Sequence, residues 1–192
     1  MNFILLLLES TKQIKYFLAS CYKFNLNDQF TKYFVPDRNV TIDETLRRFK
    51  GYWKSKVYSP DKPAKFGLKY YCLVDRNGYL LWFKLHRSSE MIEVEEGGKI
   101  YNLCKEGIDH LISFNPGISF HLYTDNYYGS LSLANYLLEK GWDLTIGLRS
   151  NRIETSALIA SLKTSIEGTG ESFACKVNNE QTLAIGAWKD KK

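Results

Sequence analysis

The chain has few of the residues that build metal sites and disulfide frameworks. Its 192 residues include 4 Cys and 3 His. No two Cys form a C-x-x-C pair, and no His stands near a Cys at ligand spacing. This pattern argues against a zinc site within the chain, and it predicts buried free thiols in a reducing compartment.

Long apolar runs are also missing. The apolar segment at residues 3–8 is far shorter than the roughly 20 residues that a membrane-spanning helix needs. No basic segment precedes it, and no small-x-small cleavage site follows. We therefore expect a core-facing helix, no secretory signal, no contact with membranes and an intracellular protein.

The composition is that of a globular chain with a mildly basic surface. Hydrophobic residues make up 44%, charged residues 24% and aromatic residues 15%, and the formal net charge is +5. Such a charge is compatible with a polyanionic partner, although many proteins that bind no nucleic acid are equally basic.

Hydrophobic periodicity and turn residues divide the chain into alternating elements. We expect helices at residues 3–24, 99–114, 131–140 and 153–166. We expect strands at residues 40–43, 68–75, 79–85, 143–148, 172–177 and 182–188, and a further strand that ends at residue 125. Tight turns are expected at Asn77-Gly78 and at Asn178-Asn179. A hairpin followed by βα units predicts an α/β fold, a mixed five-stranded sheet with flanking helices, in the order of the ribonuclease H-like fold.

Two acidic residues stand at strand ends in this order. Asp43 follows the first strand and Asp125 follows a later one, and in a ribonuclease H-like sheet these strands are neighbours. Two adjacent carboxylates repel each other, and a divalent ion such as Mg²⁺ between them relieves the repulsion. Two ions about 3.5–4 Å apart catalyse phosphodiester chemistry, and such sites normally use a third acid. Strand-end Asp residues also serve as N-caps and in turns, so spacing alone leaves that alternative open.

The segment from Arg47 to Lys69 is dense in cations and aromatic rings. Its functional interpretation is a surface that follows a phosphate backbone, with Trp53 and Tyr58 for stacking or groove contacts. The alternative is a solvated face over a core that buries the rings. The three His residues are scattered, which is typical of structural or exposed positions.

Several ordered segments resemble the piggyBac transposase family. Residues 40–69 hold Ile42-Asp43-Glu44, Phe49-Lys50-Gly51 and a Lys-Pro-Ala-Lys-Phe-Gly run, similar to the family's "IDE…FKGR…YxPxKPxKxGxK" pattern. Residues 125–130 resemble "DNxFTS", residues 147–152 resemble "GTxRxNR", and residues 188–192 resemble "WxDxK". Tyr52 departs from the pattern, because the family usually has Arg there.

The resemblance implies roles for individual residues. Asp43 and Asp125 would be the first two catalytic acids and Mg²⁺ ligands, two ions being used in the family. The third family acid lies in a "GVDxxD" segment beyond the WxDxK strand, and this chain stops at Lys192 before such a segment. DNA contacts are expected at Arg48, Lys50, Trp53, Lys54, Lys56, Lys62, Lys65, Lys69, Asn126, Arg149 and Arg152.

The resemblance also predicts the organisation and function of the chain. We expect a helical lead-in at residues 1–37, an incomplete ribonuclease H-like core at 38–148 and the beginning of a small β-containing insertion domain at 149–192. The expected function is transposase-related DNA cleavage and strand transfer, impaired in this chain because the third acid is missing. The alternative is a domesticated, non-catalytic module that binds DNA or chromatin. Expected partners are DNA and a second copy or a full-length transposase, in the nucleus.

Overall fold

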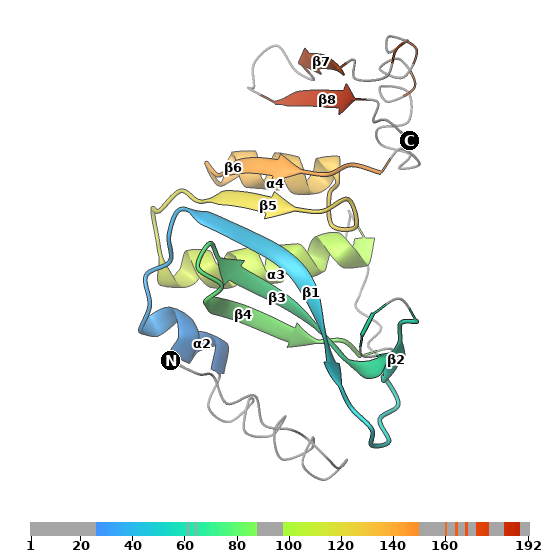
Figure 1. The fold of residues 1–192 in the computed structure, drawn as a ribbon. Helices are drawn as coiled ribbons and strands as arrows, with labels where there is room; N and C mark the ends of the chain where they lie inside the picture. Colours follow the sequence, from blue (N-terminus) through green and yellow to red (C-terminus); the bar gives the residue numbers. More distant parts are fainter. Residues whose placement is uncertain are drawn as a thin grey trace. The chain divides into compact units, whose positions relative to one another are not determined.

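The computed structural model describes an α/β chain in two units (Figure 1). The described residues are 26–60, 62–63, 65–87, 98–149, 160, 164, 168, 172–176 and 183–188. The first unit ends at Gly147 and the second begins at Leu148. Each of the two units contains a β-sheet of its own.

The first unit is built on a sheet whose central strand is β1. Its strands are β1 (Asn39–Arg48), β2 (Val57–Tyr58), β3 (Phe66–Asp75), β4 (Leu80–Leu85), β5 (His121–Thr124) and β6 (Asp143–Ile146). Five of them follow the order β4-β3-β1-β5-β6, and the short β2 pairs with the start of β3. β1 is antiparallel to β3 and parallel to β5, and β6 is parallel to β5. The predicted mixed five-stranded sheet is confirmed, with β2 as an addition.

Strand β1 is longer than the sequence indicates. The expected strand ends at Asp43, but β1 continues to Arg48. Its second half pairs with the first half of β3, where Thr45 lies opposite Tyr70 and Arg48 opposite Gly67. Hydrophobic periodicity does not predict the second half of β1, because Arg47 and Arg48 are exposed and leave no alternating apolar pattern there. The length of β1 is set by its pairing with β3.

Two amphipathic helices cover one face of this sheet. α3 (Gly98–Phe114) and α4 (Leu131–Glu139) contact each other and lie behind the strands in Figure 1. Apolar side chains at helical spacing form one core with inward-facing residues of the strands. This core includes Val40, Ile42, Leu73, Leu103, Cys104, Ile108, Leu111, Leu122, Leu133 and Leu137. The helices predicted at 99–114 and 131–140 are therefore confirmed.

The tight turn predicted between β3 and β4 is present. Gly78 adopts a positive φ of 78°, a conformation that glycine accepts without strain. The buried Asp75 side chain closes the turn, since its Oδ1 accepts hydrogen bonds from the backbone N–H groups of Asn77 (3.0 Å) and Tyr79 (2.7 Å).

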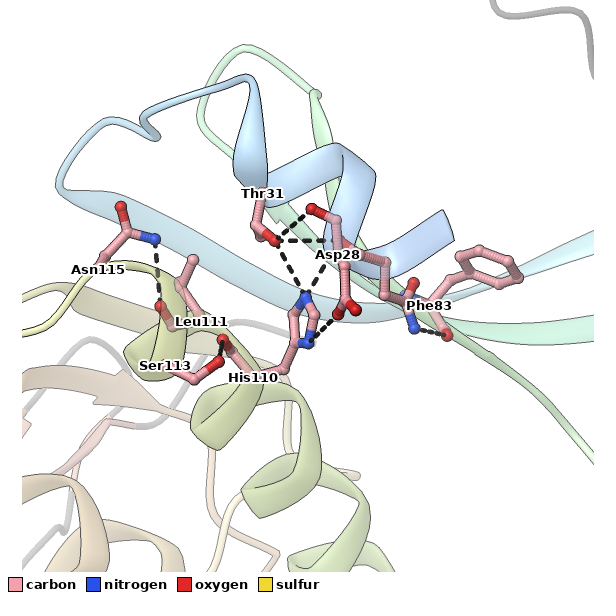
Figure 2. Close-up of polar contacts among 8 residues, drawn as sticks. Asp28, Thr31, Phe83, His110, Leu111, Ser113 and Asn115 are labelled. Atoms are coloured by element: carbon pink, nitrogen blue, oxygen red, sulfur yellow. Dashed lines mark hydrogen bonds and ion pairs between the residues drawn. The ribbon is translucent and has the colours of Figure 1, made fainter. Parts of the chain in front are cut away.

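Helix α2 (Leu26–Lys32) is fastened to α3 and to the outer strand β4 (Figure 2). The His110 Nε2 atom on α3 lies 3.2 Å from Thr31 Oγ1 and 3.1 Å from the carbonyl oxygen of Asn27. The Asn27 side chain pairs with the backbone of Phe83, donating to its carbonyl at 3.1 Å and accepting from its N–H at 3.0 Å. A side chain of α2 thus satisfies backbone groups that an outer strand would otherwise leave to solvent.

The second unit contains an antiparallel strand pair. β7 (Ser172–Lys176) pairs with β8 (Ala184–Trp188), with Ser172 opposite Trp188. Both strands were predicted. The turn predicted at residues 178–179 lies outside the described residues, as does most of the helix predicted at 153–166 and all of the one at 3–24.

Within the described part of the chain, Cys72 and Cys104 form no disulfide; Cys104 is buried, as predicted, and Cys72 is half-buried. No described helix has the length and apolar character to span a bilayer.

Candidate active site

The parallel pairing of β1 and β5 brings Asp43 and Asp125 to one edge of the sheet. Ile42 is paired with Thr124, and each of the two acids is the next residue along its own strand. Asp43 is still part of β1 and lies opposite Cys72 of β3, whereas Asp125 begins the loop that leads to α4. Both acidic side chains are exposed. The neighbouring strands predicted for this fold therefore juxtapose the two carboxylates.

The electrostatics of Asp43 reflect this crowding. Its pKa is raised above the ordinary value of 3.8, chiefly because the surrounding protein removes part of the solvent around this exposed side chain and so penalises the charged form. The negative charges of Glu44 and Asp125 raise the pKa further. Two effects oppose the shift: the backbone N–H of Glu44, which donates to Asp43 Oδ1 at 2.7 Å, and the positive charge of Lys62. Because Glu44 and Asp125 add negative charge beside Asp43, a cation at this position would be favoured.

Asp125 also holds its own loop. Its Oδ1 accepts a hydrogen bond from the backbone N–H of Tyr127 at 2.9 Å, and its carbonyl accepts from Gly129 at 3.2 Å. The N-cap of α4 is Ser130, whose Oγ accepts from the N–H of Leu133 at 3.1 Å. The turn alternative therefore applies to Asp125 and the N-cap alternative does not. A turn bond occupies one part of a carboxylate that has about four acceptor positions, so it is compatible with metal binding.

Two glycines let the Asp125 loop pack closely against the end of β6. The N–H of Gly147 donates to the carbonyl of Thr124 at 3.1 Å. A Cβ atom on Gly129 would lie 1.8 Å from the carbonyl oxygen of Gly147, and one on Gly147 would lie 2.8 Å from the backbone nitrogen of Asn126. Because these backbone atoms lie so close together, the end of β6 fixes the position of the loop that begins at Asp125.

A buried hydroxyl joins the Asp125 loop to β1. The Tyr128 ring is fully buried, and its Oη donates to Glu44 Oε2 at 2.8 Å. Burial first, and then the Glu44 carboxylate, raise the pKa of Tyr128, so the phenol remains a donor. Successive residues of a strand point to opposite faces, so Glu44 turns to the helix-covered face and Asp43 to the other. The sequence did not predict this hydrogen bond, because nothing in the local pattern distinguishes Tyr128 from Tyr127.

Lys69 lies beside the same loop among aromatic rings. Its Nζ is 5.1 Å from the centre of the Tyr71 ring and 5.0 Å from that of Tyr127, within the range of cation–π attraction. The Tyr71 hydroxyl lies 3.1 Å from His86 Nδ1, and burial and Tyr127 raise the pKa of Tyr71 to about 12. Lys69 therefore places positive charge next to the loop that carries Asp125.

Most of the other residues predicted to contact DNA lie on the surface. Between Thr45 and Val74 the chain has eight cations and one acid, Asp61. The exposed predicted residues are Arg48, Lys50, Lys54, Lys62, Lys65, Asn126 and, in the second unit, Arg149. Lys56 is half-buried and donates to the carbonyl of Gly51 at 3.1 Å. Arg152 lies outside the described residues.

Trp53 has a different position from the one expected of a stacking residue. It is half-buried and packs against the small hydrophobic cluster of Phe49, Leu68, Tyr70 and Leu85. Its indole Nε1 is buried without a hydrogen-bond partner among the described atoms. This packing favours a structural role for Trp53, whereas the Tyr58 ring is 57% exposed and faces solvent.

The chain is similar in sequence to transposases and transposase-derived proteins. A family model described as Transposase IS4 matches residues 20–192. PiggyBac transposable element-derived protein 3 of Homo sapiens is 23% identical over 172 residues, covering 84% of this chain and 29% of that protein. PiggyBac transposable element-derived protein 2 of Homo sapiens is 25% identical over 171 residues, covering 86% of this chain and 28% of that protein. The chain thus spans less than a third of the length of these relatives.

A solved structure shows the same fold. The cryo-EM structure of a piggyBac transposase synaptic complex with hairpin DNA superposes with a TM-score of 0.70 at 25% identity, covering 94% of this chain and 38% of that chain. The predicted ribonuclease H-like arrangement is therefore confirmed. Since the family model covers most of the sequence and these relatives agree with it, the chain belongs to the piggyBac transposase family.

Proposed function

We propose that this chain supplies two metal-binding acids, Asp43 and Asp125, to a DNA-processing transposase site. The observation that carries the proposal is the register of β1 and β5, which sets the two carboxylates side by side. The pKa of Asp43 is raised mainly by desolvation and, to a smaller degree, by the charges of Glu44 and Asp125, and the contribution of Asp125 supports the proposal. Repulsion between two neighbouring carboxylates reduces stability unless a cation lies between them. Such a pair is therefore typical of a metal site.

The residues present fit a hard divalent cation. Carboxylate oxygens are the ligands that Mg²⁺ prefers, and one or two of them suffice when water and phosphate complete the coordination shell. When bound, Mg²⁺ would polarise a phosphodiester and lower the pKa of an attacking hydroxyl or water. Asp43 and Asp125 would hold the ion, and the Tyr128–Glu44 bond and the Gly129–Gly147 contact would keep their carboxylates at a fixed separation.

The basic stretch is the proposed DNA-binding surface. Lys62 lies close enough to Asp43 for its positive charge to offset part of the rise in the pKa of Asp43, which connects the cationic surface to the acids. Lysine and arginine contacts to phosphates provide affinity without sequence preference and weaken steeply as salt is added. We place the DNA backbone along these cations, with the scissile phosphate near the two acids.

The degree of activity follows from the number of acids. Among the described residues, no group of three or more His, Cys, Asp and Glu side chains is arranged to hold a metal. We therefore propose that this chain alone binds one ion weakly and cleaves DNA poorly. A second copy or a full-length transposase is the proposed protein partner, and the nucleus is the proposed location.

Calorimetric titration of the chain with Mn²⁺, which accepts the same oxygen ligands as Mg²⁺, tests the metal proposal. We expect Asp43→Asn and Asp125→Asn each to weaken binding by at least about tenfold, since each removes a charged ligand. Glu139→Gln is the matched control, because Glu139 is an exposed carboxylate on α4 outside the site. Equal Mn²⁺ affinities for all four proteins would contradict the proposal.

The absence of a third clustered acid among the described residues also favours a second candidate, a non-catalytic module that binds DNA. Its DNA affinity would not respond to Asp43→Asn or to added Mg²⁺, and would fall when Lys54, Lys62 and Lys65 are replaced by Ala. A Mg²⁺-dependent nick or hairpin produced by the purified chain would exclude this candidate.

A further inference from the structure

Three aromatic rings are exposed in residues 52–66, the segment that contains β2 and leads into β3. The side chains of Tyr52, Tyr58 and Phe66 are 79%, 57% and 52% exposed. Tyr58 and Phe66 are directly paired across the two strands, and their ring centres lie 4.6 Å apart at an interplanar angle of 35°. Two adjacent rings therefore form one continuous apolar surface, called here the Tyr58–Phe66 pair.

The neighbouring core does not need these rings. The small cluster under this part of the sheet consists of Phe49, Leu68, Tyr70 and Leu85 with Trp53, Cys72 and Phe83 packed against it. Neither Tyr58 nor Phe66 belongs to that cluster, so the strands pair here while the rings remain in water. Large exposed apolar groups that lie next to each other typically mark a binding surface.

The charges around the pair select the kind of ligand. Lys56 Nζ lies 5.7 Å from the centre of the Phe66 ring. The exposed side chains of Lys54, Lys62 and Lys65 belong to the same short segment, where Asp61 is the single acid between Thr45 and Val74. A ligand that matches both features has negative charges next to flat apolar faces. Nucleotides have this combination, but in a paired duplex the base faces are hidden by stacking.

We propose that the Tyr58–Phe66 pair stacks against unpaired bases of a DNA strand whose phosphates contact the surrounding lysines. The inference rests on the proposed DNA binding and adds that the ligand presents unpaired nucleotides at this position. Every base has a face that an aromatic ring can cover, so the pair would favour unpaired DNA without a strong sequence preference.

The test compares two labelled DNAs by fluorescence anisotropy: a fully paired duplex, and the same duplex with four unpaired nucleotides at one end. We expect the unmodified chain to bind the second DNA about tenfold more tightly, a factor within the range of one stacked base. Tyr58→Ala with Phe66→Ala should remove that preference while leaving affinity for the paired duplex within about twofold, because the lysines remain.

Two controls separate stacking from other effects. Tyr33→Ala removes a ring that is 74% exposed outside this segment, and it should keep the tenfold preference. Tyr58→Phe retains the ring and should also keep it. Stacking releases few counterions, so the preference should persist when the salt concentration is raised, even though both affinities fall.

The outcomes distinguish the two proposals. If the chain binds neither DNA, the proposed DNA binding fails and the inference fails with it. If the chain binds both DNAs equally, or if the double variant keeps the preference with an unchanged circular dichroism spectrum, the inference alone is overturned. A 2-aminopurine placed among the unpaired nucleotides provides a second readout, since stacking should quench its fluorescence with the unmodified chain and not with the double variant.

Discussion

At the scale of single residues, two adjacent acids of β1 have opposite tasks. Asp43 is exposed beside Asp125, while Glu44 accepts a hydrogen bond from the buried Tyr128 hydroxyl. The alternation of side chains along a strand makes this division unavoidable. The Asp43 carboxylate remains accessible to a metal ion, whereas the Glu44 carboxylate binds the loop that carries Asp125.

Tyr128→Phe tests how much the Tyr128–Glu44 hydrogen bond contributes to stability. The change removes one hydroxyl and leaves Glu44 without its donor, so we expect a loss of about 1–3 kcal/mol in the free energy of unfolding. Urea denaturation followed by circular dichroism measures it. Tyr33→Phe is the control at an exposed ring, and it should change stability by less than about 0.5 kcal/mol. A Tyr128→Phe protein as stable as the unmodified chain would show that the bond contributes nothing.

Tyr136 predicts a response to alkaline pH. Burial and the hydrogen bond to Asp109 raise the pKa of its phenol above the ordinary value of 10.0. Above about pH 10 the unfolded chain therefore loses this proton before the folded chain does, and stability falls as the pH rises further. Tyr136→Phe should be less stable at pH 8, and the gap should narrow above pH 10. A gap that stays constant in urea titrations from pH 8 to 11 would contradict this assignment.

At the scale of elements, the Asp125 loop is held between β1 and the end of β6. Gly129→Ala would place a Cβ atom 1.8 Å from the carbonyl oxygen of Gly147, so the loop has to move. We expect a loss of about 1–3 kcal/mol in stability and weaker Mn²⁺ binding, because Asp125 moves with the loop.

Gly78→Ala is the matched control for that change. Gly78 has a positive φ of 78° and open space around it, so alanine would introduce backbone strain of roughly 1 kcal/mol without disturbing the site. Its Mn²⁺ affinity should equal that of the unmodified chain. If Gly129→Ala also binds Mn²⁺ normally, the contact with Gly147 does not position Asp125.

The α2–α3 junction makes a second element-level prediction. His110→Ala removes the contacts to Thr31 and to the carbonyl of Asn27, which fasten α2 to the core (Figure 2). Amide hydrogen exchange should accelerate in residues 26–32 and remain unchanged in β1. Equal acceleration in both segments would mean that His110 stabilises the whole unit and not this junction.

At the scale of the whole molecule, periodicity and turn residues predicted the order of the main strands and of α3 and α4, and the ribonuclease H-like order of these elements predicted the neighbouring ends of β1 and β5. Periodicity and turn residues did not predict α2 or β2. They were insufficient where tertiary contacts decide. Strand β1 continues to Arg48 through pairing with β3, and Trp53 is half-buried in a cluster although it stands among cations. The Tyr128–Glu44 bond joins residues 84 positions apart, and no local pattern contains that information.

Anomalous diffraction from crystals of this chain grown with Mn²⁺ is the most direct test of the central claim, that Asp43 and Asp125 together hold a divalent ion. The account predicts an anomalous peak coordinated by carboxylate oxygens of both residues, and its loss in the Asp43→Asn protein. A peak bound elsewhere, or none at a saturating Mn²⁺ concentration, would contradict it.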